Sequence, residues 1–167
     1  MGLSASKRVE KHLQASPEFS SACADVYADC LHLSQHAFSG IKPYQLFSAA
    51  ERLHRALTPA VPLLSRWMPH SPDRAKVDRA FRTVLSRRQG RGFEIALLSE
   101  SEFQEFATEL FVDGIVSGAG GEIMKKVPLG AAGIAAIGAI VRPGKNIVGA
   151  AIGAYAVGVV TWVYLDL

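Results

Sequence analysis

Apolar positions recur every three or four residues along the first two thirds of the chain, which is the spacing of amphipathic helices. Between residues 17 and about 112 this pattern predicts four helices that pack as a small bundle. Each helix is preceded by residues that favour a helix start. These starts are Ser16-Pro17, Lys42-Pro43, Ser71-Pro72-Asp73, and Ser99 followed by Glu102 at capping-box spacing.

Strand patterns are almost absent. The one segment with strand character runs from Phe93 to Leu98, and we interpret it as the lead-in to the last bundle helix. The predicted fold class is therefore all-α, with a small amphipathic helical bundle followed by a Gly/Ala-rich hydrophobic helical hairpin.

The pattern changes at Gly114, where a cluster of glycines is expected to interrupt the last bundle helix. Beyond it, Val127 to Val141 and Ile147 to Leu165 are runs of 15 and 19 residues without a charge. As helices they would be about 22 and 28 Å long, and the hydrocarbon core of a bilayer is about 30 Å thick. Trp162 and Tyr164 lie near the end of the longer run, as interfacial aromatic residues do.

The charged turn between the two runs limits how they can meet a membrane. If the first run crossed fully, Arg142 and Lys145 would reach the far side, against the positive-inside tendency. Two arrangements avoid this: the second run alone is a tail anchor, or the hairpin is embedded from one side. A third interpretation is a hairpin buried within a soluble fold.

Small residues recur at every fourth position or close to it in the second run, notably at Gly149, Gly153, Ala154 and Gly158. Such faces let helix backbones approach closely inside a bilayer. They could join the two runs of the hairpin, or they could join copies of the protein or a membrane protein complex.

The N-terminus matches the N-myristoylation pattern, with Gly2 exposed after removal of Met1 and Ser6 at the required position. Lys7, Arg8 and Lys11 follow and are predicted to bind an anionic membrane surface, as are Lys125 and Lys126 before the hairpin. One myristoyl chain gives only marginal membrane binding, so the hairpin is the expected second anchor. The alternative is an unmodified, frayed terminus.

Charge is distributed in blocks. Residues 66–91 hold eight basic and two acidic side chains, whereas residues 93–113 hold six acidic side chains and no basic one. Two successive helices of opposite charge most simply pack on each other as an antiparallel pair; lipid contact by the basic face is the alternative. A net charge of +3 is weak evidence for nucleic acid, and no such partner is predicted.

No catalytic, nucleotide-binding or metal-binding signature is complete in the sequence, so we predict no enzyme activity, no metal and no cofactor. Cys23 and Cys30 are expected to be small core residues in a reducing compartment. His32 and His36 share a helical face at metal-binding spacing, but a third ligand is missing nearby.

Several segments together resemble a family of short plant proteins that are described as potentially N-myristoylated and have no assigned function. The resemblance lies in Met1 to Arg8, Lys42-Pro43-Tyr44-Gln45-Leu46, Arg52-Leu53-His54 and the Gly-rich tail. It implies association with a plant plasma membrane or endomembrane, and it implies no active site.

These patterns predict three parts: an N-terminal arm over 1–15, a cytosolic helical bundle over 16–113, and a membrane hairpin or tail anchor over 114–167. The expected function is a non-enzymatic scaffold or accessory subunit on the cytosolic face of a membrane, with the lipid bilayer as its partner. Two alternatives are a small membrane-active oligomer and a soluble ligand-binding domain with the tail as its core.

Overall fold

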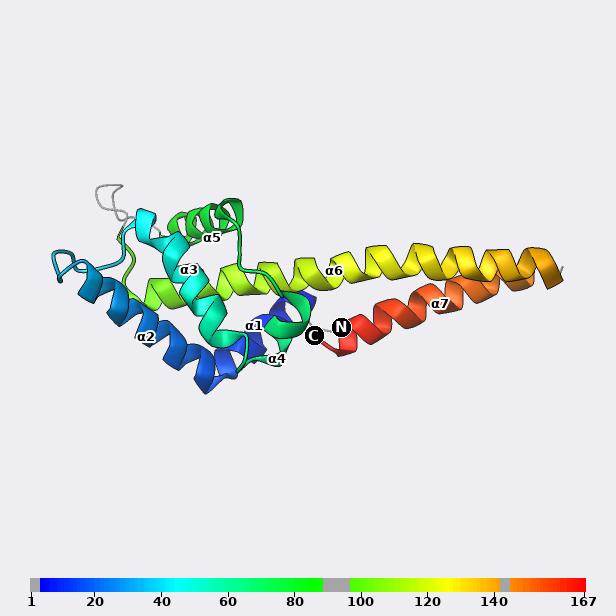
Figure 1. Cartoon of the computed structure of the whole chain (residues 1–167), viewed down its shortest axis with the longest axis horizontal. Coiled ribbons are helices and arrows are strands. Elements are labelled where there is room, and N and C mark those ends of the chain that lie inside the picture. The colour runs from blue at the N-terminus through cyan, green and yellow to red at the C-terminus, as the bar shows by residue number, and fades with distance from the viewer. Residues whose placement is uncertain (1–3, 89–96, 142–144) are drawn as a thin grey trace. The chain divides into compact units, whose positions relative to one another are not determined.

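The computed structural model describes residues 4–88, 97–141 and 145–167, and these residues form helices without a strand (Figure 1). The all-α fold class is therefore confirmed. The chain divides into two compact units, Met1–Ile115 and Val116–Leu167. The helices are α1 (Ala5–Ala15), α2 (Pro17–Leu33), α3 (Pro43–Leu57), α4 (Pro62–Trp67), α5 (Arg74–Arg87), α6 (Glu100–Val141) and α7 (Lys145–Leu165).

Helix α1 corrects the predicted N-terminal arm. Residues 5–15 form a full helix in which Val9 and Leu13 are completely buried. The Ser4 hydroxyl accepts a hydrogen bond from the Lys7 amide and caps the helix. Burial of these two aliphatic side chains stabilises the folded state. The segment is part of the first unit.

The predicted helix starts are confirmed except at α5. The Ser16 hydroxyl accepts from the Phe19 amide at 3.3 Å at the start of α2. At α5 the cap is Asp73, two residues later than the predicted Ser71, and its carboxylate accepts from the Lys76 amide at 2.8 Å. A carboxylate is a strong acceptor and is favoured by the helix dipole, which explains the later start.

Helix α6 is longer than the sequence suggests. It continues through Gly114, Gly118, Gly120 and Gly121 and through Pro128, so the predicted interruption is wrong. A glycine in a helix interior costs only about 1 kcal/mol, which packing on both sides of the cluster offsets. Its first turn has the predicted capping box: the Ser99 amide donates to Glu102 Oε2 at 2.9 Å, and the Glu102 amide donates to the Ser99 hydroxyl at 3.4 Å.

Phenylalanines are the largest fully buried side chains in the core of the first unit. Phe19, Phe103, Phe106 and Phe111 are fully buried. Phe19 and Phe111 meet edge to face with ring centroids 6.3 Å apart, which ties α2 to α6. Cys23 and Cys30 are free and buried in this core, as predicted.

A short backbone pairing closes the bundle at one end. Ile41 and Leu98 form an isolated antiparallel bridge, in which each amide donates to the other's carbonyl at 2.9 Å. Leu98 is therefore not part of a helix lead-in; residues 93–96 of that prediction lie outside the described part of the chain. Gly40 is required beside this bridge, because a Cβ there would lie 2.5 Å from the Leu98 carbonyl oxygen.

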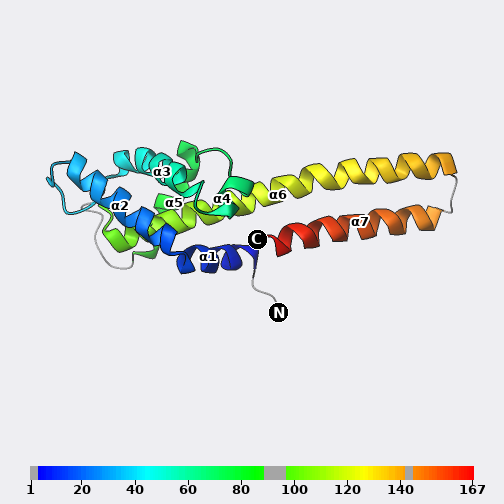
Figure 2. The ribbon, with the colours of Figure 1, turned by 60° about the horizontal axis from the view of Figure 1, so that its bottom comes forward.

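The second unit is a helical hairpin, as the sequence predicts. The end of α6 and helix α7 run in opposite directions alongside each other (Figures 1 and 2). Residues 142–144 between the two helices lie outside the described residues, and Arg142 with them.

Candidate membrane hairpin

Helix α7 is the most apolar element. Among the described residues it is the one helix long and apolar enough to cross a membrane: Asn146–Leu165 has a mean hydropathy of 1.8 over its best window, of which 6% is buried. Twenty residues of helix are about 30 Å long, the thickness of a bilayer's hydrocarbon core. An apolar helix that its own chain leaves uncovered requires another apolar environment.

Three contacts hold the two arms of the hairpin together. The Tyr155 hydroxyl donates to the Lys126 carbonyl at 3.3 Å. The Lys126 ammonium lies 4.7 Å from the centroid of the Trp162 ring, a cation–π contact. The Tyr155 ring also lies directly against Gly130, where any Cβ would overlap it. Gly130 therefore permits the close approach of α6 and α7.

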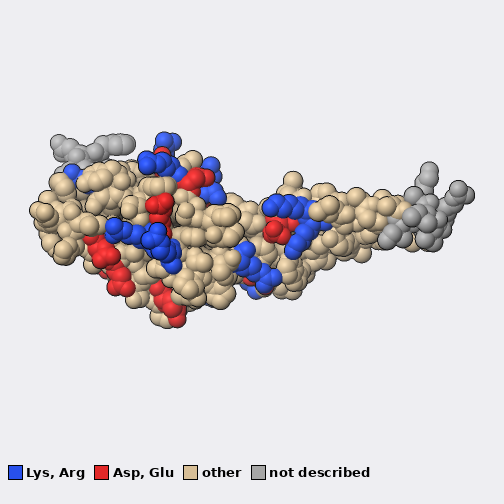
Figure 3. Space-filling model, in the orientation of Figure 1, with Lys and Arg blue, Asp and Glu red and all other residues tan. Residues whose placement is uncertain are grey.

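The Lys126 ammonium has a second partner on its own helix. It lies 3.4 Å from Glu122 Oε2, one turn earlier in α6. Lys125, its neighbour, is exposed. We call the group Glu122, Lys125, Lys126 and Trp162 the base of the hairpin. On the face shown in Figure 3, charged side chains occur on the first unit and near the start of the second, and the described surface beyond carries none.

The four predicted helix-packing residues do not pack the hairpin. An added Cβ at Gly149, Gly153 or Gly158 would have no atom of the chain within 4 Å, and Ala154 is exposed. The half-buried or buried positions of α7 are different ones: Val148, Ile152, Ala156, Val159, Val163 and Tyr164. The small-residue face of α7 thus points away from the chain.

The sequence missed Gly130 and Tyr155 as contact residues. Their pairing depends on the register of two antiparallel helices, which hydropathy does not encode. Gly130 sits in a segment with several small residues, so composition alone cannot distinguish it from Gly133, which has open space around it.

The predicted membrane-surface lysines and arginine fall into two groups. Lys7 and Lys11 are exposed and Arg8 is half-buried on α1 of the first unit, whereas Lys125 and Lys126 belong to the second unit. Gly2, the predicted lipidation site, lies outside the described residues.

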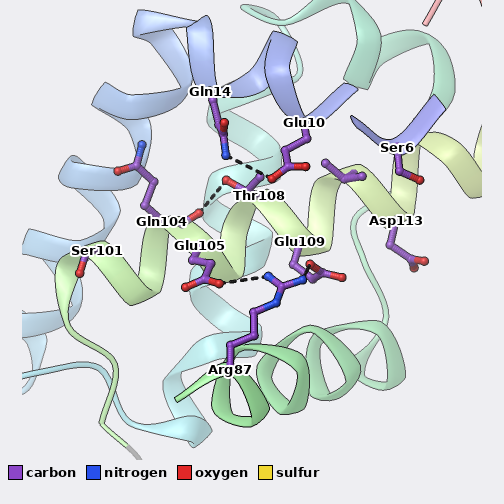
Figure 4. Close-up of a pocket in the computed structure, with 11 residues that line it drawn as sticks. Ser6, Glu10, Gln14, Arg87, Ser101, Gln104, Glu105, Thr108, Glu109 and Asp113 are labelled. Carbon is purple, nitrogen blue, oxygen red and sulfur yellow. Dashed lines mark hydrogen bonds and ion pairs between the residues drawn. The ribbon is translucent and has the colours of Figure 1, made fainter. Parts of the chain in front are cut away.

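A polar groove of about 630 Å³ lies between α1, α5 and α6 (Figure 4). Arg87 extends from α5 and donates to Glu105 at 3.0 Å and Glu109 at 2.9 Å on α6. The hydrogen bond to Glu105 is the main reason why the pKa of Arg87 is raised. These contacts confirm the predicted packing of the basic helix against the acidic one. The groove is lined by Ser6, Glu10, Gln14, Arg87, Ser101, Gln104, Glu105, Thr108, Glu109, Val112 and Asp113.

Both cysteines, Cys23 and Cys30, are buried. Burial raises the pKa of Cys23 to about 12, which keeps its thiol protonated and weakly nucleophilic at neutral pH. His36 lies beyond the end of α2 with a φ of 53°, yet its ring still meets that of His32 edge to face, with centroids 6.2 Å apart. Within the described ranges no three His, Cys, Asp or Glu side chains are grouped to hold a metal ion.

No family model, curated protein or solved structure matches this chain. Inferences about function therefore come from its own residues.

Proposed function

We propose that the protein is a non-enzymatic scaffold or accessory subunit, anchored in a membrane by its hairpin, with its helical bundle on the cytosolic face. The observation that carries this proposal is the exposure of α7, an apolar helix of membrane-spanning length with 6% of its best window buried. That exposure is the opposite of what a soluble ligand-binding domain with the tail as its core would require.

The cost of leaving α7 in water supports a bilayer as the main partner. Ile147, Val157 and Leu165 are each more than 60% exposed on this one helix. Apolar surface contributes about 25 cal/mol per Å² when it leaves water, so a whole helix of such residues gains many kcal/mol on insertion. Insertion also satisfies every backbone group within the helix, as a bilayer demands.

The bundle supplies the scaffold in this proposal. Its helices belong to a compact unit, and its charged side chains pair between helices, as Arg87 and Arg88 do with glutamates of α6. These pairs fix the helices and leave broad polar faces for a protein partner. Gly2 acylation would add a second, weaker hold.

Alkaline carbonate extraction tests the anchor. Membranes containing the full chain are washed at high pH, and the Gly2→Ala variant, which cannot be acylated, is compared with the unchanged protein. We expect both to stay in the pellet, because an inserted hairpin resists carbonate whereas a peripheral protein does not. Release of Gly2→Ala into the supernatant would show that the hairpin is no anchor and would overturn the proposal.

A second candidate function is a small membrane oligomer, favoured by the open face at Gly149, Gly153 and Gly158. Close helix packing in lipid uses such faces. Cross-linking in detergent tests it: the Gly149→Leu/Gly153→Leu variant should lose self-association. If the unchanged protein is a monomer, this function is excluded.

A further inference from the structure

The contacts within the hairpin bear on which side of the membrane each end lies. The sequence of the tail is compatible with two arrangements in a membrane, a single-span tail anchor and a hairpin that returns. In a tail anchor the C-terminus lies on the opposite side from the bundle. In a returning hairpin it lies on the same side.

The arms are joined by specific contacts. The hydrogen bond from Tyr155 to the Lys126 carbonyl, the ring of Tyr155 on Gly130, and Lys126 on the Trp162 ring join two residues of α6 to two of α7. A tail anchor formed by α7 alone would break all three. It would also leave the uncharged run from Val127 to Val141 in water.

The lengths of the two arms agree. From Lys126 to Val141, α6 advances 15 residues, and from Asn146 to Trp162, α7 advances 16 residues. These are about 22 and 24 Å of helix. Both are several Å shorter than the hydrocarbon core is thick, so the arms fit a hairpin that is embedded from one side and does not cross fully.

The residues at the base have the chemistry of a bilayer surface. Trp162 is 45% exposed on α7 and lies beneath the Lys126 ammonium. Tryptophan and lysine concentrate at this depth, where one end of the side chain is apolar and the other is hydrated. Glu122 and Lys125 come before this level on α6 and carry the charges that must stay in water.

We infer that α7 and the end of α6 enter the bilayer as one unit, with Lys126 and Trp162 at the membrane surface, so that the C-terminus returns to the side of the bundle. The inference rests on the proposed function. Beyond that function, it specifies how deep the hairpin lies and on which side of the membrane the C-terminus lies. The exposed face of α7 then contacts the lipid bilayer.

Protease protection in sealed microsomes tests the topology. The full chain carries an epitope after Leu167, and a second antibody detects the bundle. We expect protease to remove the epitope and the bundle together in intact vesicles, with no further change after detergent. An epitope that survives until detergent is added, while the bundle is digested, would mean a single span and would overturn the inference.

Fluorescence quenching tests the depth. The chain has two tryptophans, and the Trp162→Phe variant retains Trp67, which is buried in the bundle. Subtracting the signal of this variant from that of the unchanged protein isolates Trp162 without disturbing the bundle core. In vesicles of phosphatidylcholine, lipids brominated near the glycerol should quench Trp162 several-fold more than lipids brominated near the chain end. The reverse order would place Trp162 deep in the bilayer and contradict the inference.

Vesicle flotation of the same samples distinguishes failure of the membrane anchor from failure of the returning hairpin. Protein that fails to float with vesicles overturns the proposed membrane anchor itself. Protein that floats, yet has a protected epitope or a deep Trp162, overturns only the returning hairpin.

Discussion

At the scale of single residues, Arg88 joins three parts of the bundle. It ends α5, donates to both carboxylate oxygens of Glu102 at 2.8 and 2.6 Å, and donates to the Leu97 carbonyl at 2.6 Å. Its side chain is 15% exposed and that of Glu102 is 20% exposed. A charged pair with this fork geometry is stronger than an exposed one, because solvent screens it less.

Replacing Arg88 should therefore destabilise the bundle more than replacing its neighbour. Arg88→Gln leaves a partly buried carboxylate and carbonyl without their donor, and we expect a loss of about 2 kcal/mol. Arg87→Gln is the matched control, since the Arg87 side chain is 52% exposed and exposed pairs contribute less than about 1 kcal/mol. Thermal unfolding of the full chain in detergent, followed by circular dichroism, measures both. Equal losses would contradict this ranking.

The same pair predicts how stability depends on pH. The hydrogen bonds from Arg88 lower the pKa of Glu102 from 4.5 to about 2 in the folded protein. Because the folded pKa lies below the unfolded one, the stabilisation is present above pH 4.5 and is lost as the pH falls towards 2. The melting temperature should fall as the pH is lowered from 4.5 towards 2, and it should fall less in Glu102→Gln. The same slope in both proteins would assign the acid sensitivity to other groups.

At the scale of elements, α1 shows how a short helix is fixed by two residues. Val9 and Leu13 are four positions apart, so they lie on the same face and are buried together, while Lys7 and Lys11 on the same helix are exposed. The helix therefore presents its lysines to solvent while it packs against the bundle.

Truncating Leu13 tests whether α1 is part of the bundle. Leu13→Ala removes a fully buried side chain, and we expect a loss of about 2–4 kcal/mol of stability. Leu33→Ala makes the same change at the end of α2, where the side chain is 63% exposed, and should cost less than about 0.5 kcal/mol. Chemical denaturation of both variants in detergent measures the difference. A Leu13→Ala variant as stable as Leu33→Ala would return residues 5–15 to a loose arm.

The spacing of apolar residues predicted the helices well, whereas the glycines predicted the end of a helix less well. The apolar spacing through Phe19 and Cys23 led to α2, and the opposite charges of α5 and α6 led to their contact through Arg87. The glycines from Gly114 onward led to the wrong prediction that the helix is interrupted there. A glycine lowers the stability of a helix by an amount that packing can offset. The Met68 side chain fills the space where a Cβ of residue 114 would lie, and the sequence does not reveal this tertiary contact.

In the candidate membrane hairpin, local properties were predicted from the sequence and contacts between helices were not. Length and hydropathy sufficed to find α7 as a helix long and apolar enough to cross a membrane, since both are local properties. The contacts of Tyr155 with Gly130 and Lys126 were not found, because they depend on how two helices slide past each other. The small-residue face was recognised, whereas its direction, away from α6, required the structure.

At the scale of the whole molecule, the exposed apolar face of α7 has a different role from exposed apolar residues on the bundle. Val157 on α7 and Tyr44 on α3 are 67% and 72% exposed. The first belongs to a helix without a charge from Ile147 to Leu165, whereas α3 carries charged residues such as Glu51 and Arg52. Scattered exposed apolar residues are normal on a soluble surface and need no partner.

A charge introduced at each position separates the two roles. Val157→Arg places a cation in the middle of the proposed membrane helix, which costs about 2.5–3.5 kcal/mol at the centre of a bilayer and lowers vesicle partitioning roughly 100-fold. Tyr44→Arg makes the same kind of change on the bundle and should leave partitioning unchanged. Vesicle flotation gives the partition coefficients, and circular dichroism shows that both variants retain their helices. If the two variants float equally well, α7 does not lie in the bilayer, and its apolar face must be covered by protein instead.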